Sequence, residues 1–210
     1  GPWNHINRIN APDAYEWSVK QTLPIANLIC WACQRQLDRG LHFIVENPYT
    51  SDLWNLENWS KLRSDPRVKE VMHDQCMSGL TNPIKELVQK RTRFIASDFT
   101  LIHRLDQMCD HSHSHGQIAG QIAGKQVSRY VQKWTRNLCS KIVDGIIELK
   151  TLERRSKWKQ NHLTTSLLQN LMKVFPAASS SAGSGQAAQA NDELDADPQK
   201  ERPHKSAGFD

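Results

Sequence analysis

The sequence predicts an α/β domain followed by a long basic helix and a disordered acidic tail. Three observations support this fold class. The apolar run 41–45 leads directly into Glu-Asn-Pro, as a buried strand does where it enters a turn. Helical periodicity precedes this run and returns over residues 126–150. From residue 176 onward the chain is rich in Ala, Ser, Gly and Gln, a composition that buries too little apolar surface to fold.

The N-terminal part is predicted to be a loop followed by a helix. Residues 3–12 show no apolar period and are predicted to be a loop. The helix covers residues 13–40 and is expected to kink or split at Pro24. Its apolar stripe includes Cys30 and Cys33, which we interpret as small core residues, with a metal or redox pair as the alternative.

The remaining elements follow from periodicity and turn residues. Strands are predicted over 41–46, 68–73 and 94–96, and helices over 51–63, 99–108, 126–150 and 163–175. Trp54 and Trp59 are interpreted as core or interface residues, with base stacking as the alternative. The tandem Gln-Ile-Ala-Gly repeat at 117–124 is predicted to be a loop. The expected regions are a partial α/β region at 1–115, a helical basic region at 116–175 and the acidic tail at 176–210.

Charge and cysteine content narrow the class of partner. The 210 residues carry a net charge of +5, and the six acidic and three basic residues of 176–210 contribute −3 of it. The remaining +8 on residues 1–175 favours nucleic acid as a partner. Five cysteines without a signal sequence, and no apolar run near ~20 residues, indicate an intracellular protein, the nucleus included, without a membrane span. Because the chain lacks an initiating Met, we interpret it as an incomplete natural protein, with Gly1-Pro2 as a protease-cleavage scar or the start of a fragment. The rest of a larger polyprotein is then a candidate partner.

Two short motifs carry a family resemblance. Glu46 and Asn47 end the apolar run, and Gln89, Arg91 and Arg93 form a Gln-x-Arg-x-Arg segment that leads into the strand at 94–96. In this order they resemble parts of a divergent cytosine-5 DNA methyltransferase-like domain of the mobile-element or polyprotein type. The likeness covers about residues 41–97. Taken alone, Asn and Pro are also ordinary turn residues, and the arginines also suit a solvated strand face.

The resemblance implies a fold and an activity. It implies a partial Rossmann-like methyltransferase sheet with flanking helices, and S-adenosylmethionine as the cofactor. It also implies that Glu46 and Asn47 are catalytic residues that contact a flipped cytosine, and that Glu46 faces Arg91 and Arg93 in one cleft. The family's Pro-Cys nucleophile and Gly-rich cofactor turn do not occur in the chain. We therefore expect a fragment that contacts nucleic acid and is inactive on its own.

A second cluster predicts a metal site. Cys109, His111, His113 and His115 lie within seven residues, and Cys76 follows a predicted strand. Thiolate and imidazole are the ligands that Zn²⁺ prefers, and alternating histidines in an extended loop place their rings on one side. The sequence therefore predicts zinc bound by these five residues, with a polar His-rich loop that binds no metal as the alternative.

Two further functions compete with the methyltransferase-like fragment. One is a non-catalytic nucleic-acid-binding module that uses the basic stretch 125–159, and the other is a structural or interaction segment of a mobile-element polyprotein. The candidate nucleic-acid-binding residues are Gln89, Arg91, Arg93, Lys125, Arg129, Lys133, Arg136, Arg154 and Arg155.

Overall fold

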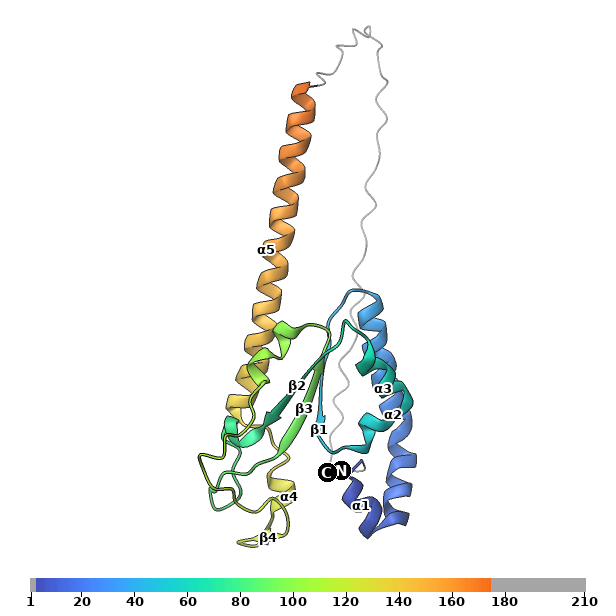
Figure 1. Ribbon diagram of the computed structural model, residues 1–210, viewed down its shortest axis with the longest axis vertical. Helices are drawn as coiled ribbons and strands as arrows, with labels where there is room; N and C mark the ends of the chain where they lie inside the picture. The colour runs from blue at the N-terminus through green and yellow to red at the C-terminus, as the bar shows by residue number, and fades with distance from the viewer. Residues whose placement is uncertain (1–2, 175–210) are drawn as a thin grey trace, which may run out of the picture. The chain divides into compact units, whose positions relative to one another are not determined.

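A computed structural model describes residues 3–174 of the chain as a mixed α/β protein (Figure 1). The chain divides into two units, residues 1–164 and 165–210, of which the second is described only over residues 165–174. The helices are α1 (His5–Asn10), α2 (Pro12–Asp38), α3 (Glu57–Ser64), α4 (Val127–Tyr130) and α5 (Arg136–Val174). The strands are β1 (Ile44–Pro48), β2 (Lys69–Asp74), β3 (Arg91–Ala96), β4 (Gln121–Ile122) and β5 (Lys125–Gln126). The 3₁₀ turns are η1 (Asp52–Asn55), η2 (Gln75–Ser78), η3 (Phe99–Leu101) and η4 (His103–Leu105).

The central sheet has three strands in the order β1-β3-β2, and β3 is antiparallel to both neighbours. The sequence correctly predicts these three strands to within a few residues. The Rossmann-like sheet that it also predicts is not confirmed, because that sheet is mostly parallel whereas these ladders are antiparallel. A small β4–β5 ladder begins where a loop is predicted, since Gln121 and Ile122 of the second Gln-Ile-Ala-Gly copy pair with Gln126 and Lys125.

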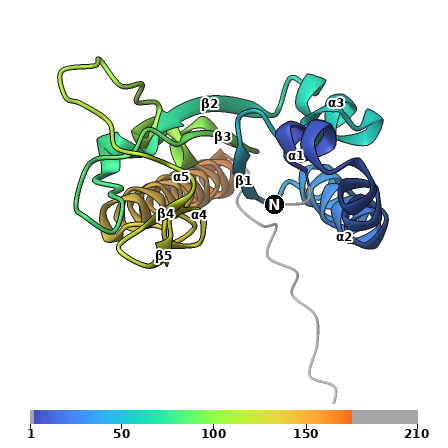
Figure 2. The same cartoon turned by 90° about the horizontal axis from the view of Figure 1, so that it is seen from below.

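Helices α2 and α3 cover one face of the sheet, as the view in Figure 2 shows. Cys30 and Cys33 lie buried in this core beside Trp54 and Trp59, which confirms that the cysteines and tryptophans are packing residues. Helix α2 continues through Pro24, so the predicted split is wrong. The lost hydrogen bond is tolerated there because the proline lies on the exposed side of the helix.

The other face of the sheet packs against η3, η4 and the first turns of α5. Phe94 and Ala96 of β3 meet Leu138 and Leu149 of α5 in this second core. The helix approaches closely at Gly145, where an added Cβ would lie 2.6 Å from the carbonyl oxygen of Leu101. Glycine at this position therefore allows α5 to lie against the backbone of η3.

Several predicted elements are corrected by the structure. The predicted loop at 3–12 contains α1, which Asn4 caps through a 3.0 Å bond from the Ile6 N–H. The predicted helix at 99–108 is two separate 3₁₀ turns. The predicted helix at 126–150 is interrupted after α4, and α5 then runs on through the range predicted as a separate helix, to Val174.

The interruption before α5 has a tertiary cause. The Thr135 hydroxyl donates to the carbonyl of Ser78 at 2.7 Å and accepts from the Leu138 N–H at 3.1 Å. This residue therefore caps α5 and ties it to η2. The predicted disordered tail lies outside the described residues. No described helix is long and apolar enough to cross a membrane.

Candidate metal centre

The segment after η4 is held alongside β2 by backbone hydrogen bonds. The Asp74 N–H donates to the Gln107 carbonyl at 2.9 Å, and the Gln107 N–H donates to the Met72 carbonyl at 3.2 Å. These bonds form a parallel bridge between His73 and Gln107. Cys109 therefore lies close to Cys76, which η2 presents directly after the strand.

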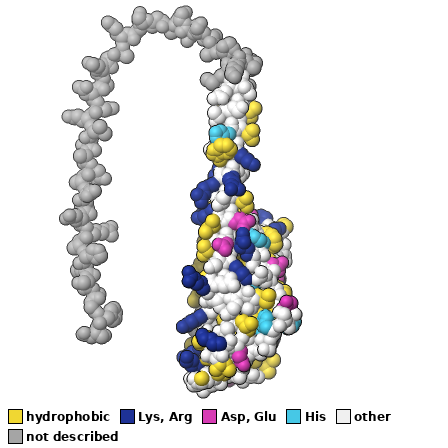
Figure 3. Space-filling model, turned by 90° about the vertical axis from the view of Figure 1, so that its left-hand side faces the viewer, with side chains coloured by type: hydrophobic (Ala, Val, Ile, Leu, Met, Phe, Trp, Pro, Cys, Tyr) yellow, Lys and Arg dark blue, Asp and Glu magenta, His cyan; other side chains and the backbone are white. Residues whose placement is uncertain are grey.

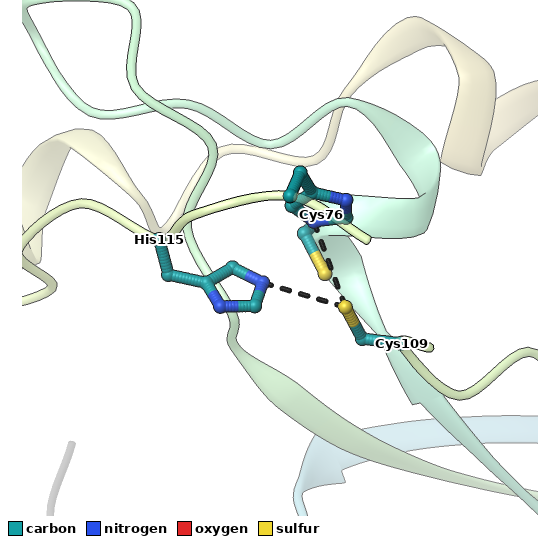
Figure 4. A group of neighbouring side chains, drawn as sticks. Cys76, Cys109 and His115 are labelled. Atoms are coloured by element: carbon teal, nitrogen blue, oxygen red, sulfur yellow. Dashed lines mark hydrogen bonds between the residues drawn. The ribbon is translucent and has the colours of Figure 1, made fainter. Parts of the chain in front are cut away.

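Four side chains converge at this point. One ligand atom from each of Cys76, Cys109, His113 and His115 lies within 4.8 Å of the other three. The Cys109 Sγ is 3.6 Å from the Nε2 of His113 and 3.5 Å from the Nε2 of His115. Figure 4 shows the two sulfur atoms directed toward each other and the His115 ring directed at Cys109.

These distances match a tetrahedral zinc site. With Zn–S near 2.3 Å and Zn–N near 2.0–2.1 Å, the S···N edge of a tetrahedron is about 3.5 Å. The two S···N distances agree with that edge. The donor set of two thiols and two imidazoles fits Zn²⁺, and the four protein ligands complete its usual coordination number.

Asp74 holds one of the ligands in place through a backbone hydrogen bond. Its carboxylate is fully buried and accepts hydrogen bonds from the Cys109 N–H at 3.0 Å, from the Gln89 amide at 3.0 Å, and from Arg91. The guanidinium of Arg91 is bidentate, with Nε 3.0 Å from Oδ1 and Nη2 3.1 Å from Oδ2. Burial alone would raise the pKa of Asp74, but these bonds outweigh it and lower the pKa to about 2. The carboxylate therefore stays charged and fixes the backbone of one ligand.

The thiol of Cys76 favours the protonated form without a cation. Burial raises its pKa well above the ordinary value, and the adjacent Cys109 and the charge of Asp74 raise it further. A divalent cation reverses this preference, because a coordinated thiol is deprotonated. Without a metal ion the Cys76 thiol therefore stays protonated, and it becomes a thiolate when it binds one.

His111 is left outside the group, which corrects the five-ligand prediction. Its backbone adopts φ +58°, so the loop turns at this residue and is not the extended strand on which the prediction of three aligned rings depended. The His111 N–H instead donates to the Cys109 sulfur at 3.3 Å. Such a bond stabilises a thiolate ligand, so His111 contributes through its backbone and not its ring.

Gly116 docks the end of the ligand loop. Its N–H donates to the Leu87 carbonyl at 2.7 Å. A Cβ built on Gly116 would lie 2.5 Å from the Asn82 side-chain nitrogen and 2.6 Å from the Glu86 Cβ. The loop that carries His113 and His115 thus lies directly against the 82–86 turn, and only glycine fits there.

A chain of polar contacts joins the ligand segments to α5. The Nζ of Lys141 lies 3.1 Å from the Ser78 hydroxyl and 2.5 Å from the Gln107 side-chain oxygen. The Ser78 hydroxyl also lies 2.8 Å from Nε2 of the fully buried His73, whose Nδ1 lies 3.0 Å from the Leu105 carbonyl. One lysine of α5 therefore contacts η2, which carries Cys76, and the segment that leads to Cys109.

The predicted cleft between Glu46 and the arginines is absent among the described residues. In the β1–β3 register Glu46 is opposite Phe94 and Asn47 is opposite Arg93. Because neighbouring residues of a strand point to opposite faces, Glu46 shares a face with Phe94, and both Arg91 and Arg93 lie on the other face. The expectation that one acidic group faces two guanidinium groups is therefore wrong.

Each of these residues has a different partner instead. Burial raises the pKa of Glu46, while Lys90 and the Thr92 hydroxyl lower it. Arg93 lies 3.0 Å from the Glu70 carboxylate, with its guanidinium 4.9 Å from the Tyr49 ring and 5.4 Å from the Trp54 ring. Arg93 therefore stabilises the sheet and its helical cover and is not exposed for phosphate binding. Gln89 and Arg91 are engaged by Asp74, as described above.

The remaining predicted nucleic-acid contacts are exposed. Figure 3 shows many more Lys and Arg than Asp and Glu side chains on the face that includes α5. The exposed basic residues named from the sequence are Lys125, Arg129, Lys133, Arg136, Arg154 and Arg155. We call these six residues the basic set. They lie on β5, on α4, on the connection to α5 and on α5 itself.

Comparisons with protein-family models, with curated proteins and with solved structures found no match for this chain. The site therefore has to be judged on its own geometry. Sequence reasoning missed Asp74, Gly116 and Lys141. An acidic residue between a buried strand and a cysteine is a signal that could have indicated Asp74, but the roles of Gly116 and Lys141 depend on contacts with residues far away in the sequence.

Proposed function

We propose that this chain is a zinc-stabilised nucleic-acid-binding module without catalytic activity of its own. The observation that carries the proposal is the convergence of Cys76, Cys109, His113 and His115 to within 4.8 Å. A site with four protein ligands leaves no open position for a substrate or an activated water, which favours a structural role for the metal. The ion would supply folding free energy to a part of the chain that has few apolar contacts.

The metal acts on the placement of α5. Cys76 is in η2 and Cys109 follows Gln107, and both of these segments contact Lys141. Thr135 adds a 2.7 Å bond from the start of α5 to Ser78. A metal ion that holds the two segments together therefore also holds the anchor of the basic helix.

The basic set is the proposed contact surface for phosphates. Its six side chains are exposed, and none of them has an ion pair with an acidic side chain among those found in the described part of the chain. Lysine and arginine on a helical surface bind the backbone of nucleic acid and release counterions. This mode of binding carries no sequence information, so we expect affinity for duplexes and single strands of many sequences.

The methyltransferase resemblance stays a prediction, and so does the S-adenosylmethionine that it implies. Its central geometric expectation failed, because Glu46 and the arginines lie on opposite faces of the sheet. We therefore assign no catalytic role to Glu46 or Asn47 in the proposed function.

Binding of labelled duplex and single-stranded DNA and RNA, measured by fluorescence anisotropy between 50 and 200 mM salt, tests the proposal. We expect the affinity of the zinc-loaded full chain to fall by roughly 10³-fold or more over this range if six phosphates are contacted. The double variant R154Q/R155Q should reduce the slope of log affinity against log salt by about 2. The control K61Q/K69Q, at exposed positions on α3 and β2, should leave the slope unchanged.

Two results would contradict the proposal. The first is no binding to any of the four nucleic acids at 50 mM salt. The second is binding that is equally strong after zinc has been removed with a chelator, since the metal is proposed to place the basic helix.

A further inference from the structure

Helix α2 has two apolar faces. One face buries Ala26, Cys30, Cys33 and Leu37 against the sheet. The other exposes large apolar side chains, with 67% of Trp17, 61% of Leu28 and 60% of Trp31 accessible. Single exposed apolar residues are common, but a row of them opposite the core face of one helix indicates an interaction surface.

The residues on this exposed face of α2 are placed almost symmetrically before and after Pro24. Trp17 and Trp31 lie seven residues before and after the proline, and Asp13 and Arg35 lie eleven residues before and after it. Steps of seven and eleven residues return to the same side of an α-helix, so these five residues share one face. The 6.0 Å distance between the Arg35 guanidinium and the Trp31 ring confirms that the C-terminal pair is adjacent.

We propose that this row is the interface of a homodimer in which two copies of α2 pack antiparallel around a two-fold axis at Pro24. In a two-fold interface residue i meets residue j and j meets i, so every match occurs twice. Trp17 of each copy then stacks on Trp31 of the other, and Asp13 of each copy pairs with Arg35 of the other. Antiparallel packing also places the helix ends of opposite polarity side by side.

The row is complementary to itself, which favours a second copy over an unrelated partner. The acidic end of the row comes at the start of α2 and the basic end near its finish, so a parallel pairing would place like charges together. The two tryptophans alone offer roughly 200–300 Å² of accessible surface per copy. This is a fraction of the roughly 800 Å² per partner of a standard interface, so we expect a dimer that dissociates on dilution.

Sedimentation equilibrium of the full chain, with zinc present, tests the proposal. We expect a mass that rises with concentration from 24.0 kDa toward twice that value. The variant W17S/W31S should stay monomeric, with an unchanged circular dichroism spectrum because neither side chain belongs to the buried core. The control I84S removes an apolar side chain outside α2 that is 53% accessible, and it should dimerise normally.

Charge-reversal variants test the proposed two-fold axis directly. The variants D13R and R35D each place two like charges in contact at both ends of the dimer, so each should weaken self-association at least tenfold. An equimolar mixture of the two variants should restore the dimer, because every contact across the mixed pair is again of opposite sign. A chain that stays monomeric at all concentrations overturns the proposal, as does a dimer that persists in W17S/W31S or a mixture that does not reassociate.

Discussion

The packed sheet and the ligand loop are stabilised by different means. On the α2–α3 side, ten buried residues that include Trp54 and Trp59 form one continuous apolar core. Around the ligand loop, the nearby apolar cluster has only four buried members, Leu80, Val88, Val127 and Val131. The ligand loop relies instead on the Cys and His ligands, on Asp74 and on the Lys141 network. The comparison teaches that apolar packing covers both faces of the sheet, whereas polar contacts and, as we propose, metal coordination hold the loop beyond the end of β2.

The largest expected effect comes from removing a ligand. The variant C109S should lose zinc binding, because structural zinc sites contribute on the order of 10 kcal/mol through all their ligands together. Hydrogen exchange should then show protection lost over residues 105–131 and retained in α2 and α3. The matched control C139S changes an exposed cysteine outside the site and should keep both zinc and protection. Uniform loss of protection in C109S would contradict the contrast between the packed sheet and the ligand loop.

Removing an aromatic residue from the α2–α3 core should lower the stability of the fold and leave zinc binding unchanged. Trp59 is 1% exposed, and W59A should lower the free energy of unfolding by about 3–5 kcal/mol. Denaturant unfolding measures the loss. The zinc content of the chains that remain folded should be unchanged, because Trp59 packs in the α2–α3 core. Lower zinc content in the folded fraction would show that the α2–α3 core and the ligand loop are not independent.

A smaller effect on zinc affinity is expected from a change at Asp74, which supports a ligand without being one. The variant D74N removes the negative charge and one of the two acceptor oxygens, so Arg91 loses its bidentate partner and the bond from the Cys109 N–H weakens. Zinc affinity should therefore fall about 10–100-fold. Competition with a chromophoric chelator measures this change. The control D65N removes a carboxylate that pairs with Arg67 on the α3 side and should not alter zinc affinity. Equal losses in D74N and D65N would argue against a specific support for the ligand.

The smallest effect concerns pH. Burial, together with the charge of Lys141, lowers the pKa of His73 from 6.5 to about 4. Below pH 6.5 the unfolded chain binds a proton at His73 that the folded chain takes up only near pH 4. The contribution of His73 to the free energy of unfolding is therefore full above pH 6.5 and declines as the pH falls. Between pH 7 and pH 5.5 the loss from His73 should be about 1 kcal/mol. Urea unfolding of the zinc-loaded chain at both values should show a correspondingly smaller decline for H73Q, and an identical decline would exclude His73 as the cause.

The contribution of the sequence can be judged residue by residue. Cys109, His113 and His115 were predictable as candidate ligands because their types and spacing are local. Cys76 is far from them in the sequence and was named only because it follows a predicted strand. The exclusion of His111 was not predictable, because its positive φ depends on how the loop turns. The face of the sheet on which Glu46 lies was also not predictable. An unbroken apolar run shows no alternation of polar and apolar residues, and a shift of one residue in strand register exchanges the two faces.

The helix break before α5 was not predictable for a related reason. The period of apolar residues continues through 131–135, and the interruption comes from the bond between Thr135 and Ser78, which are far apart in the sequence. The strands, the Trp54 and Trp59 core and the presence of a long basic helix were predictable, because each depends on local pattern.

X-ray absorption at the zinc edge of the purified full chain tests the central claim most directly. We predict one zinc per chain, with two sulfur neighbours near 2.3 Å and two nitrogen neighbours near 2.0–2.1 Å. In C109S the two-sulfur shell should disappear, while C139S should keep it. A chain that retains no zinc, or zinc surrounded only by oxygen and nitrogen, would contradict the proposed metal centre and the placement of α5 that depends on it.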